Sequence, residues 1–234
     1  MILDSLLQFS SAQAITATAD STNVLDLGAN RDVGPGRIPL VVFASAATAF
    51  THGTATATMT VSLYGAPNNA GVAGTYFEIG KTPALPLSML QAGMKVAQFV
   101  VPSVSQGAIA GVTTTAATTA SSTTMTVASA TGLINGMFVY GGQGTPGSAT
   151  VTGIVPGTRI ASQSGTTLTL DTAATVTNAA GTYFTFSDVP PAVRFLKLTY
   201  TSSTGSFTGG TMNAYLAGDI DQGFFYPPGF TVAN

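Results

Sequence analysis

The sequence predicts an all-β protein in which a small β module is inserted into a larger β domain. Its composition is the first indication, because Thr, Val and small residues are abundant while Glu and Lys are scarce, which favours strands and tight turns. The second is the alternation of apolar and polar residues in several segments, with the period of a half-buried strand. The third is that residues 107–189 contain only three charged residues, Arg159, Asp171 and Asp188.

Charge is scarce throughout the chain, at 7% of residues against a usual value of about 25%. The net charge of −2 provides no basic surface for nucleic acid, so we expect no nucleic-acid partner. The chain has no Cys, which excludes disulfides and thiolate metal sites. A surface rich in Thr, Gly and Ala suits a protein that buries much of its area against partners.

The N-terminal segment predicts a chain that is not exported. Residues 1–9 contain no basic residue, and Asp4 interrupts their apolar run, so they match a signal peptide poorly. No apolar run approaches the roughly 18 residues of a membrane span. We therefore expect a soluble chain, made in the cytoplasm, with no membrane partner.

The apolar residues of this segment fit neither the helical nor the strand period. They are Leu3, Leu6, Leu7 and Phe9. Such a segment either forms a core strand of its own domain or docks as an arm on a neighbouring subunit. In the second case these four residues are candidate contacts with a partner.

The larger domain contains several predicted strands, of which Thr54–Tyr64 alternates most strictly. The others in its first part are Val24–Gly28, Ile38–Phe43, Tyr76–Gly80 and Gly93–Pro102.

A Gly- and Pro-rich loop, Asn30–Arg37, separates two of these strands and concentrates charge in Arg31, Asp32 and Arg37. It is either a solvated loop or a set of polar contacts with a partner.

Residues 193–217 predict the hairpin around which the larger domain is organised. In Val193–Tyr200, Lys197 and Thr199 alternate with Leu196, Leu198 and Tyr200, and Met212, Ala214 and Leu216 alternate in a second segment. Thr201–Gly205 between them has turn chemistry. We expect the two strands to pair with each other.

The region 107–189 predicts an all-β module of its own. Two segments echo each other, Ser121–Val127 and Ser162–Leu170, each with Thr on one face and apolar residues on the other. Removing the module joins the strand near Val101 to the strand at Val193. We therefore predict one discontinuous domain from residues 1–105 and 190–234, with residues 107–189 inserted at a loop.

The C-terminal segment contains four aromatic residues without a regular pattern. They are Phe224, Phe225, Tyr226 and Phe230. Pro227 and Pro228 favour an extended arm, and the aromatic rings favour burial. The arm packs either on its own chain or on a neighbouring subunit.

No motif in the sequence predicts catalysis, a cofactor or a metal site, so we expect a protein that is not an enzyme. His52 is the only His, and no nucleophile elbow accompanies it, which favours a surface-loop residue. Asp219 and Asp221 lack the third acidic position and the distal Glu of a calcium loop. The Gly141–Gly147 loop has no Lys for a phosphate loop.

Two parts of the sequence resemble a known family, the capsid cement (decoration) proteins of tailed bacteriophages, which have a jelly-roll fold. The similar segments are Met1–Ile15, Ser21–Gly28, Arg31–Asp32, Arg194–Tyr200, Phe207–Gly210 and Ala214–Leu216. The resemblance covers roughly residues 1–105 and 190–220. The segment Thr123–Leu133 separately resembles small β modules of phage virion proteins, whereas the cement proteins lack such an insert.

The resemblance implies a jelly-roll β-sandwich and a structural role. A protein of this kind lies on the outer surface of the phage head, clamps neighbouring major capsid subunits and forms a small homo-oligomer, a dimer or a trimer, after synthesis in the bacterial cytoplasm. The alternative is a host-surface or glycan-binding virion module of the tail or head fibre type, with the insert as the binding unit. A third hypothesis is a polysaccharide depolymerase. The chain has no Trp, the residue type that commonly stacks on sugar rings in such enzymes.

Overall fold

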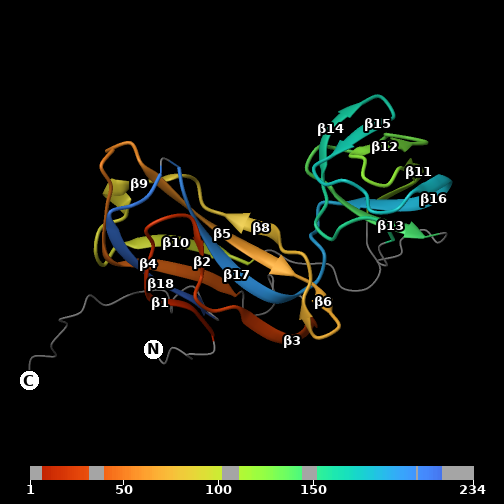
Figure 1. Cartoon of the computed structure of the whole chain (residues 1–234). Helices are drawn as coiled ribbons and strands as arrows, with labels where there is room; N and C mark the ends of the chain where they lie inside the picture. The colour runs from red at the N-terminus through yellow and green to blue at the C-terminus, as the bar shows by residue number, and fades with distance from the viewer. Residues whose placement is uncertain (1–6, 32–39, 102–110, 144–151, 204, 218–234) are drawn as a thin grey trace, which may run out of the picture.

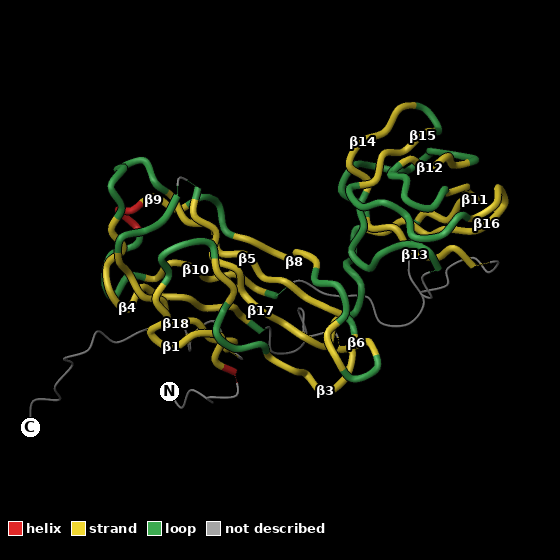
Figure 2. The backbone as a smooth tube through the Cα atoms, in the orientation of Figure 1, coloured by secondary structure: helices red, strands yellow, loops and turns green. Residues whose placement is uncertain are grey.

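The computed structural model describes residues 7–31, 40–101, 111–143, 152–203 and 205–217. These residues form two β bodies, a sandwich and a separate barrel (Figure 1). Strands and loops account for nearly all of both bodies, and a short 3-10 turn, η2 (Leu87–Met89), lies in the sandwich (Figure 2).

The sandwich consists of two antiparallel sheets. Sheet I has the order β1 (Gln8–Ala14), β18 (Gly209–Ala217), β4 (Val41–Thr51) and β10 (Lys95–Val100). Sheet II has the order β2 (Ala19–Asp20), β17 (Val193–Ser202), β5 (Thr58–Ala66) and β8 (Phe77–Lys81). In sheet II, β3 (Leu25–Arg31) also pairs with β17, and β9 (Leu85–Pro86) pairs with β5. A small hairpin joins β6 (Asn68–Asn69) to β7 (Val72–Ala73).

This strand order is that of a jelly roll. Counted along the chain, the eight principal strands lie in the order 1-8-3-6 in sheet I and 2-7-4-5 in sheet II. Late strands therefore insert between early ones in both sheets, as two interlocked Greek keys require. The predicted fold class, an all-β jelly-roll sandwich with an inserted small β unit, is confirmed.

The predicted hairpin of residues 193–217 is wrong, although both of its strands exist. β17 pairs with β2, β3 and β5 in sheet II, whereas β18 pairs with β1 and β4 in sheet I. The chain passes from sheet II to sheet I between Ser202, where β17 ends, and Gly209, where β18 begins. Each strand has one apolar face. Because the strands lie in different sheets, their apolar faces meet inside the sandwich, whereas a flat hairpin would place both faces on the same side of one sheet.

The sandwich core is filled by alternating residues of both sheets. Leu198 and Tyr200 from sheet II and Phe9 and Met212 from sheet I are fully buried in it. Each such side chain contributes roughly 1.5–3 kcal/mol by burial. The Tyr200 hydroxyl lies 2.7 Å from Ser10 Oγ, so its polar tip has a partner. Burial is the main reason that the pKa of Tyr200 is raised.

The barrel contains six antiparallel strands. They are β11 (Val112–Thr118), β12 (Thr124–Val127), β13 (Phe138–Gln143), β14 (Ile160–Ser164), β15 (Thr167–Leu170) and β16 (Asn178–Ser187), in the order β13-β16-β11-β12-β15-β14. The two edges meet through a bridge between Phe138 and Arg159, and Ile160 N–H donates to Met137 O at 2.9 Å. The echoing segment Ser121–Val127 supplies β12. The segment Ser162–Leu170 is not one strand but the end of β14, a turn at residues 165–166 and β15, and β15 pairs directly with β12.

The barrel has a hydrophobic core that is distinct from the core of the sandwich. Met125, Leu168 and Phe184 are fully buried in it. Strand β13 serves both bodies, because its side chains alternate between two faces. Val139 belongs to the barrel core, and its neighbours Phe138 and Tyr140 belong to the sandwich core.

Candidate functional site

Three of the residues predicted as partner contacts, Leu7, Phe9 and Arg31, lie within the described part of the chain. Leu3, Leu6, Asp32, Arg37, Phe224, Phe225, Tyr226 and Phe230 lie outside the described residues. Phe9 is fully buried in the sandwich core, and Leu7 is partly buried against it. The N-terminal strand therefore serves its own domain at Phe9, which is one of the two interpretations of that segment. Arg31 is the last residue of β3.

The strand registers place the start of β1, the end of β3, the start of β4 and the end of β18 at one end of the sandwich. Gln8 pairs with Tyr215, Ala217 with Val41, and Val193 with Arg31. At the opposite end, residues 52–57 join β4 of sheet I to β5 of sheet II. The start of β4 and the end of β5 therefore lie at the same end of the sandwich. The barrel lies in the chain between Val100 of β10 and Val193 of β17, and both of these residues lie at the end of the sandwich where β4 begins. We call this end the barrel end (Figure 1).

The barrel packs on the sandwich through aromatic side chains. The rings of Phe77 from β8 and Phe138 from β13 meet edge to face, with centroids 6.2 Å apart. Tyr140 donates its hydroxyl proton to the backbone carbonyl of Val189, and its burial raises its pKa. A Cβ on Gly157, which has φ +89°, would lie 2.2 Å from Phe77 Cβ, so only glycine permits this approach.

Arg159 is the polar centre of this junction. Its Nη2 donates to the backbone carbonyl of Glu78 at 2.7 Å, and its guanidinium carbon lies 4.3 Å from the centroid of the Phe138 ring. Asp171 Oδ1 accepts the backbone N–H of Arg159 at 2.9 Å. Two of the three charged residues of the insert therefore lie at its junction with the sandwich.

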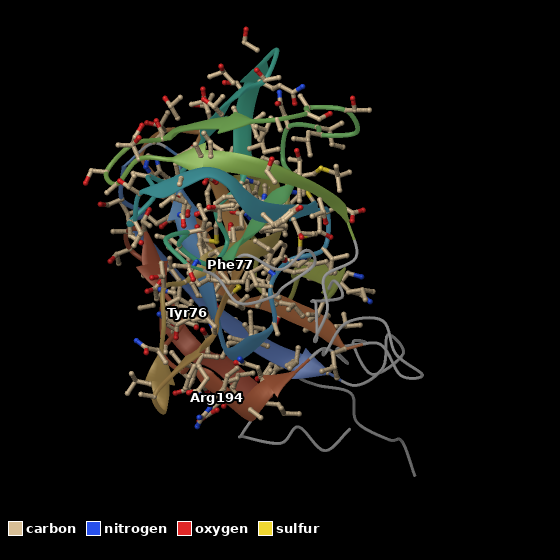
Figure 3. All side chains as sticks on the ribbon, turned by 90° about the vertical axis from the view of Figure 1, so that its right-hand side faces the viewer. Tyr76, Phe77 and Arg194 are labelled. Carbon is tan, nitrogen blue, oxygen red and sulfur yellow. The ribbon has the colours of Figure 1, made fainter. Side chains whose placement is uncertain are left out.

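A pocket of about 380 Å³ lies beside Arg159, between the two bodies. We call it the junction pocket. Its walls come from β5, β8 and the segment before β8 on the sandwich, and from the segments around Gly157 and Asp171 on the barrel. Figure 3 shows Phe77 and Tyr76 on the side of the sandwich that faces the barrel, with Arg194 farther away.

Arg194 organises the outer face of sheet II at some distance from the pocket. Its Nε and Nη2 donate to the two carboxylate oxygens of Asp26 at 2.7 and 2.8 Å, and Nη1 donates to Asn68 Oδ1 at 3.2 Å. The paired guanidinium, together with the N–H of Gly28, lowers the pKa of Asp26 to about 2. The bidentate pair with Asp26 joins β17 to β3, and the single hydrogen bond to Asn68 joins β17 to the β6–β7 hairpin.

Lys197 connects this face to the junction pocket. Its Nζ donates to Asp20 Oδ2 at 2.5 Å and lies 4.4 Å from the centroid of the Tyr76 ring. Burial alone would raise the pKa of Asp20, but the hydrogen bonds from Lys197 and Thr199 outweigh it and lower the value. The alternation of β17 predicted that Lys197 and Thr199 share a face, and no local pattern predicts Tyr76 as a neighbour.

His52 lies in the loop after β4, where its Nδ1 accepts the N–H of Thr54 at 2.8 Å. Among the described residues, no group of three or more His, Asp or Glu side chains is placed to bind a metal ion. Within the same residues, no helix is long and apolar enough to span a membrane.

Comparison with known proteins identifies one family. A family model described as Bbp16 matches residues 9–128, which is just over half of the chain. The match runs from β1 through β12, and so covers the first six principal strands of the sandwich and the first two strands of the barrel. No curated protein matches the chain.

Proposed function

The chain belongs to the phage-related Bbp16 family, and on this basis we propose that it is a capsid cement protein on the outer surface of a phage head. The observation that carries the proposal is the match of this family to a chain whose sandwich is a jelly roll. The proposed partners are the major capsid protein and further copies of the chain. The proposed role is structural and not catalytic.

The mechanism of such a protein is linkage between binding and shell stability. A protein that binds the assembled shell and not the free subunits stabilises the shell by mass action. Many copies on one lattice add avidity without new kinds of contact. The barrel end supports this role, because the predicted contacts Leu7 and Arg31 lie at strand ends there, Leu7 just before β1 and Arg31 at the end of β3.

A second candidate function is a host-surface binding module. The observation that favours it is the barrel, which projects from the sandwich as a separate body with its own core (Figure 1). In that case the sandwich attaches the protein to the virion and the barrel binds the surface of the host.

The number of copies on a purified virion separates the two. Quantitative mass spectrometry against the major capsid protein should give a ratio typical of a lattice component, with hundreds of copies per particle. A handful of copies would contradict the cement proposal and favour a tail or receptor protein. As a second test, shells assembled without the protein should bind it when it is added back, whereas free capsid subunits should not.

A further inference from the structure

We propose that the junction pocket binds a neutral saccharide unit, with Tyr76 and Arg159 as its principal contacts. This binding activity goes beyond the cement role and does not rest on it. The argument uses the position of the pocket, its unused hydrogen-bonding groups, its charge and its rigidity.

The pocket has the size and the position of a small-molecule site. Its volume of about 380 Å³ falls within the usual range of about 300–1,000 Å³, and such sites are common where two domains meet. Phe77 contributes buried apolar surface to it, and the exposed residues Thr75, Asp171 and Thr172 open it to solvent. A ligand can therefore enter without separating the two bodies.

Several polar groups in the pocket have unused hydrogen-bonding capacity. Within the described part of the chain, the side-chain hydroxyls of Tyr64, Tyr76, Thr75 and Thr172 make no hydrogen bond. The guanidinium of Arg159 donates through Nη2 to Glu78 and has further N–H groups at Nε and Nη1. Hydroxyls donate and accept, so this set matches a ligand whose own hydroxyls do both.

The charges around the pocket favour a neutral ligand. Arg159 contributes one positive charge, and Glu78 and Asp171 contribute one negative charge each. Lys81 Nζ lies 3.1 Å from the Glu78 carboxylate and balances it. A site without a net charge does not select an anion or a cation.

The aromatic rings favour a cyclic ligand over an open chain. Tyr64, Tyr76 and Phe77 all line the pocket, and the Lys197 ammonium lies 4.4 Å from the centroid of the Tyr76 ring. The electron-rich face of an aromatic ring attracts positively polarised hydrogens, and one side of a pyranose presents several such C–H groups together. An open-chain polyol does not hold these groups in one plane.

The polar centre of the site is fixed before any ligand arrives. Arg159 is held by the Phe138 ring, by the Glu78 carbonyl and, at its backbone, by Asp171. A preorganised group loses little conformational entropy on binding, which favours affinity. In a module with only three charged residues, two lie at this pocket.

The test is an NMR titration of the full chain, followed through its backbone amides. The probes are methyl β-glucoside, methyl β-galactoside and N-acetylglucosamine, with sorbitol as an open-chain control and sodium acetate as an anion control. We expect saturable shifts at Tyr76, Gly157 and Thr172 with at least one cyclic saccharide, and none there with sorbitol or acetate.

Variants assign the binding to the pocket. Tyr76→Ala should weaken the saccharide by about tenfold, equivalent to about 1.4 kcal/mol. Tyr183→Ala is the matched control, because it removes an exposed tyrosine of β16 that lies outside the pocket. Arg159→Lys retains the charge and loses the planar donor fork, so it should also weaken binding.

The proposal is overturned if none of the three saccharides gives saturable shifts, or if Tyr76→Ala and Tyr183→Ala bind alike. Shifts with acetate alone would make the pocket an anion site and would also contradict it. The titration uses the free protein, so its outcome is independent of the copy number on the virion. Failure of either proposal is therefore distinguishable from failure of the other.

Discussion

The sandwich and the barrel are both built from antiparallel strands, but they use charge in opposite ways. All three ion pairs among the described residues lie on the sandwich, at Glu78–Lys81, Asp26–Arg194 and Asp20–Lys197. Threonine hydroxyls meet across strands in both bodies, at 3.2 Å between Thr113 and Thr185 in the barrel and at 2.9 Å between Thr48 and Thr211 in the sandwich, so this kind of contact does not distinguish them. Arg159 and Asp171 of the barrel lie at the junction. The difference indicates that charge in the insert serves attachment to the sandwich.

The largest expected effect tests whether the two cores are independent. Leu168 in the barrel and Leu198 in the sandwich are both fully buried. Replacing either by Ala should lower the free energy of unfolding of its own body by about 2–5 kcal/mol. Hydrogen exchange should then accelerate in β15 and β16 for Leu168→Ala, and in β5 and β17 for Leu198→Ala. Equal acceleration in both bodies for either variant would show one cooperative unit.

Deleting the barrel should reveal how much the sandwich depends on it. Replacement of residues 107–189 by a short Gly/Ser linker should leave a folded β-sandwich, because no sandwich strand comes from that range. It should lose roughly 1.5–3 kcal/mol, because Phe77 loses the cover of Phe138. Circular dichroism and chemical denaturation measure the two outcomes. An insoluble or unfolded product would contradict the discontinuous-domain prediction.

Gly157 offers a finer test of the junction. Ala at this position meets both an unfavourable φ and the ring of Phe77, whereas Gly136, with φ +94°, has no atom within 4 Å of an added Cβ. Both variants carry the backbone cost, so Gly136→Ala is a matched control. We expect Gly157→Ala to lose about 1–3 kcal/mol more, from the clash alone. Denaturant unfolding measures the difference, and equal losses would show that the barrel moves aside freely.

The sequence predicts strands well in this protein because alternation is a local property. β5 begins at Thr58 and not at Thr54, where Ala57 N–H donates to Thr54 O in a turn. Strand partners are not local, which is why β17 and β18 suggested a hairpin. The apolar faces of β17 and β18 can be buried either in one hairpin or in two facing sheets. Only the topology of the whole domain decides between these two arrangements.

The junction was only partly predictable for the same reason. Arg159 was visible as the only basic residue of the insert, but nothing in its local sequence indicates that it contacts Phe138. Phe77, which meets Phe138, and Glu78, which accepts from Arg159, lie about 60 and 80 residues away from these partners in the chain, so no spacing connects them. The aromatic residues of the C-terminal segment lie outside the described residues, and their role stays a prediction.

The smallest expected effect concerns the ion pairs that distinguish the sandwich. The pKa of Asp26 is lowered to about 2, first by the hydrogen bonds from Arg194 and then by the N–H of Gly28 at 2.8 Å. A carboxyl group with a lowered pKa contributes its stabilisation above the ordinary value of 3.8 and loses it as pH falls through about 2. In Arg194→Gln the midpoint of the Asp26 titration should therefore move toward the ordinary value of 3.8. The chemical shift of the Asp26 carboxyl carbon in NMR measures this midpoint. Lys197→Gln is the control, because Lys197 pairs with Asp20 and should leave the Asp26 midpoint unchanged. A midpoint that stays near 2 in Arg194→Gln would assign the low pKa to the Gly28 backbone instead, and the ion pair would then be a consequence of the β3 turn and not its cause.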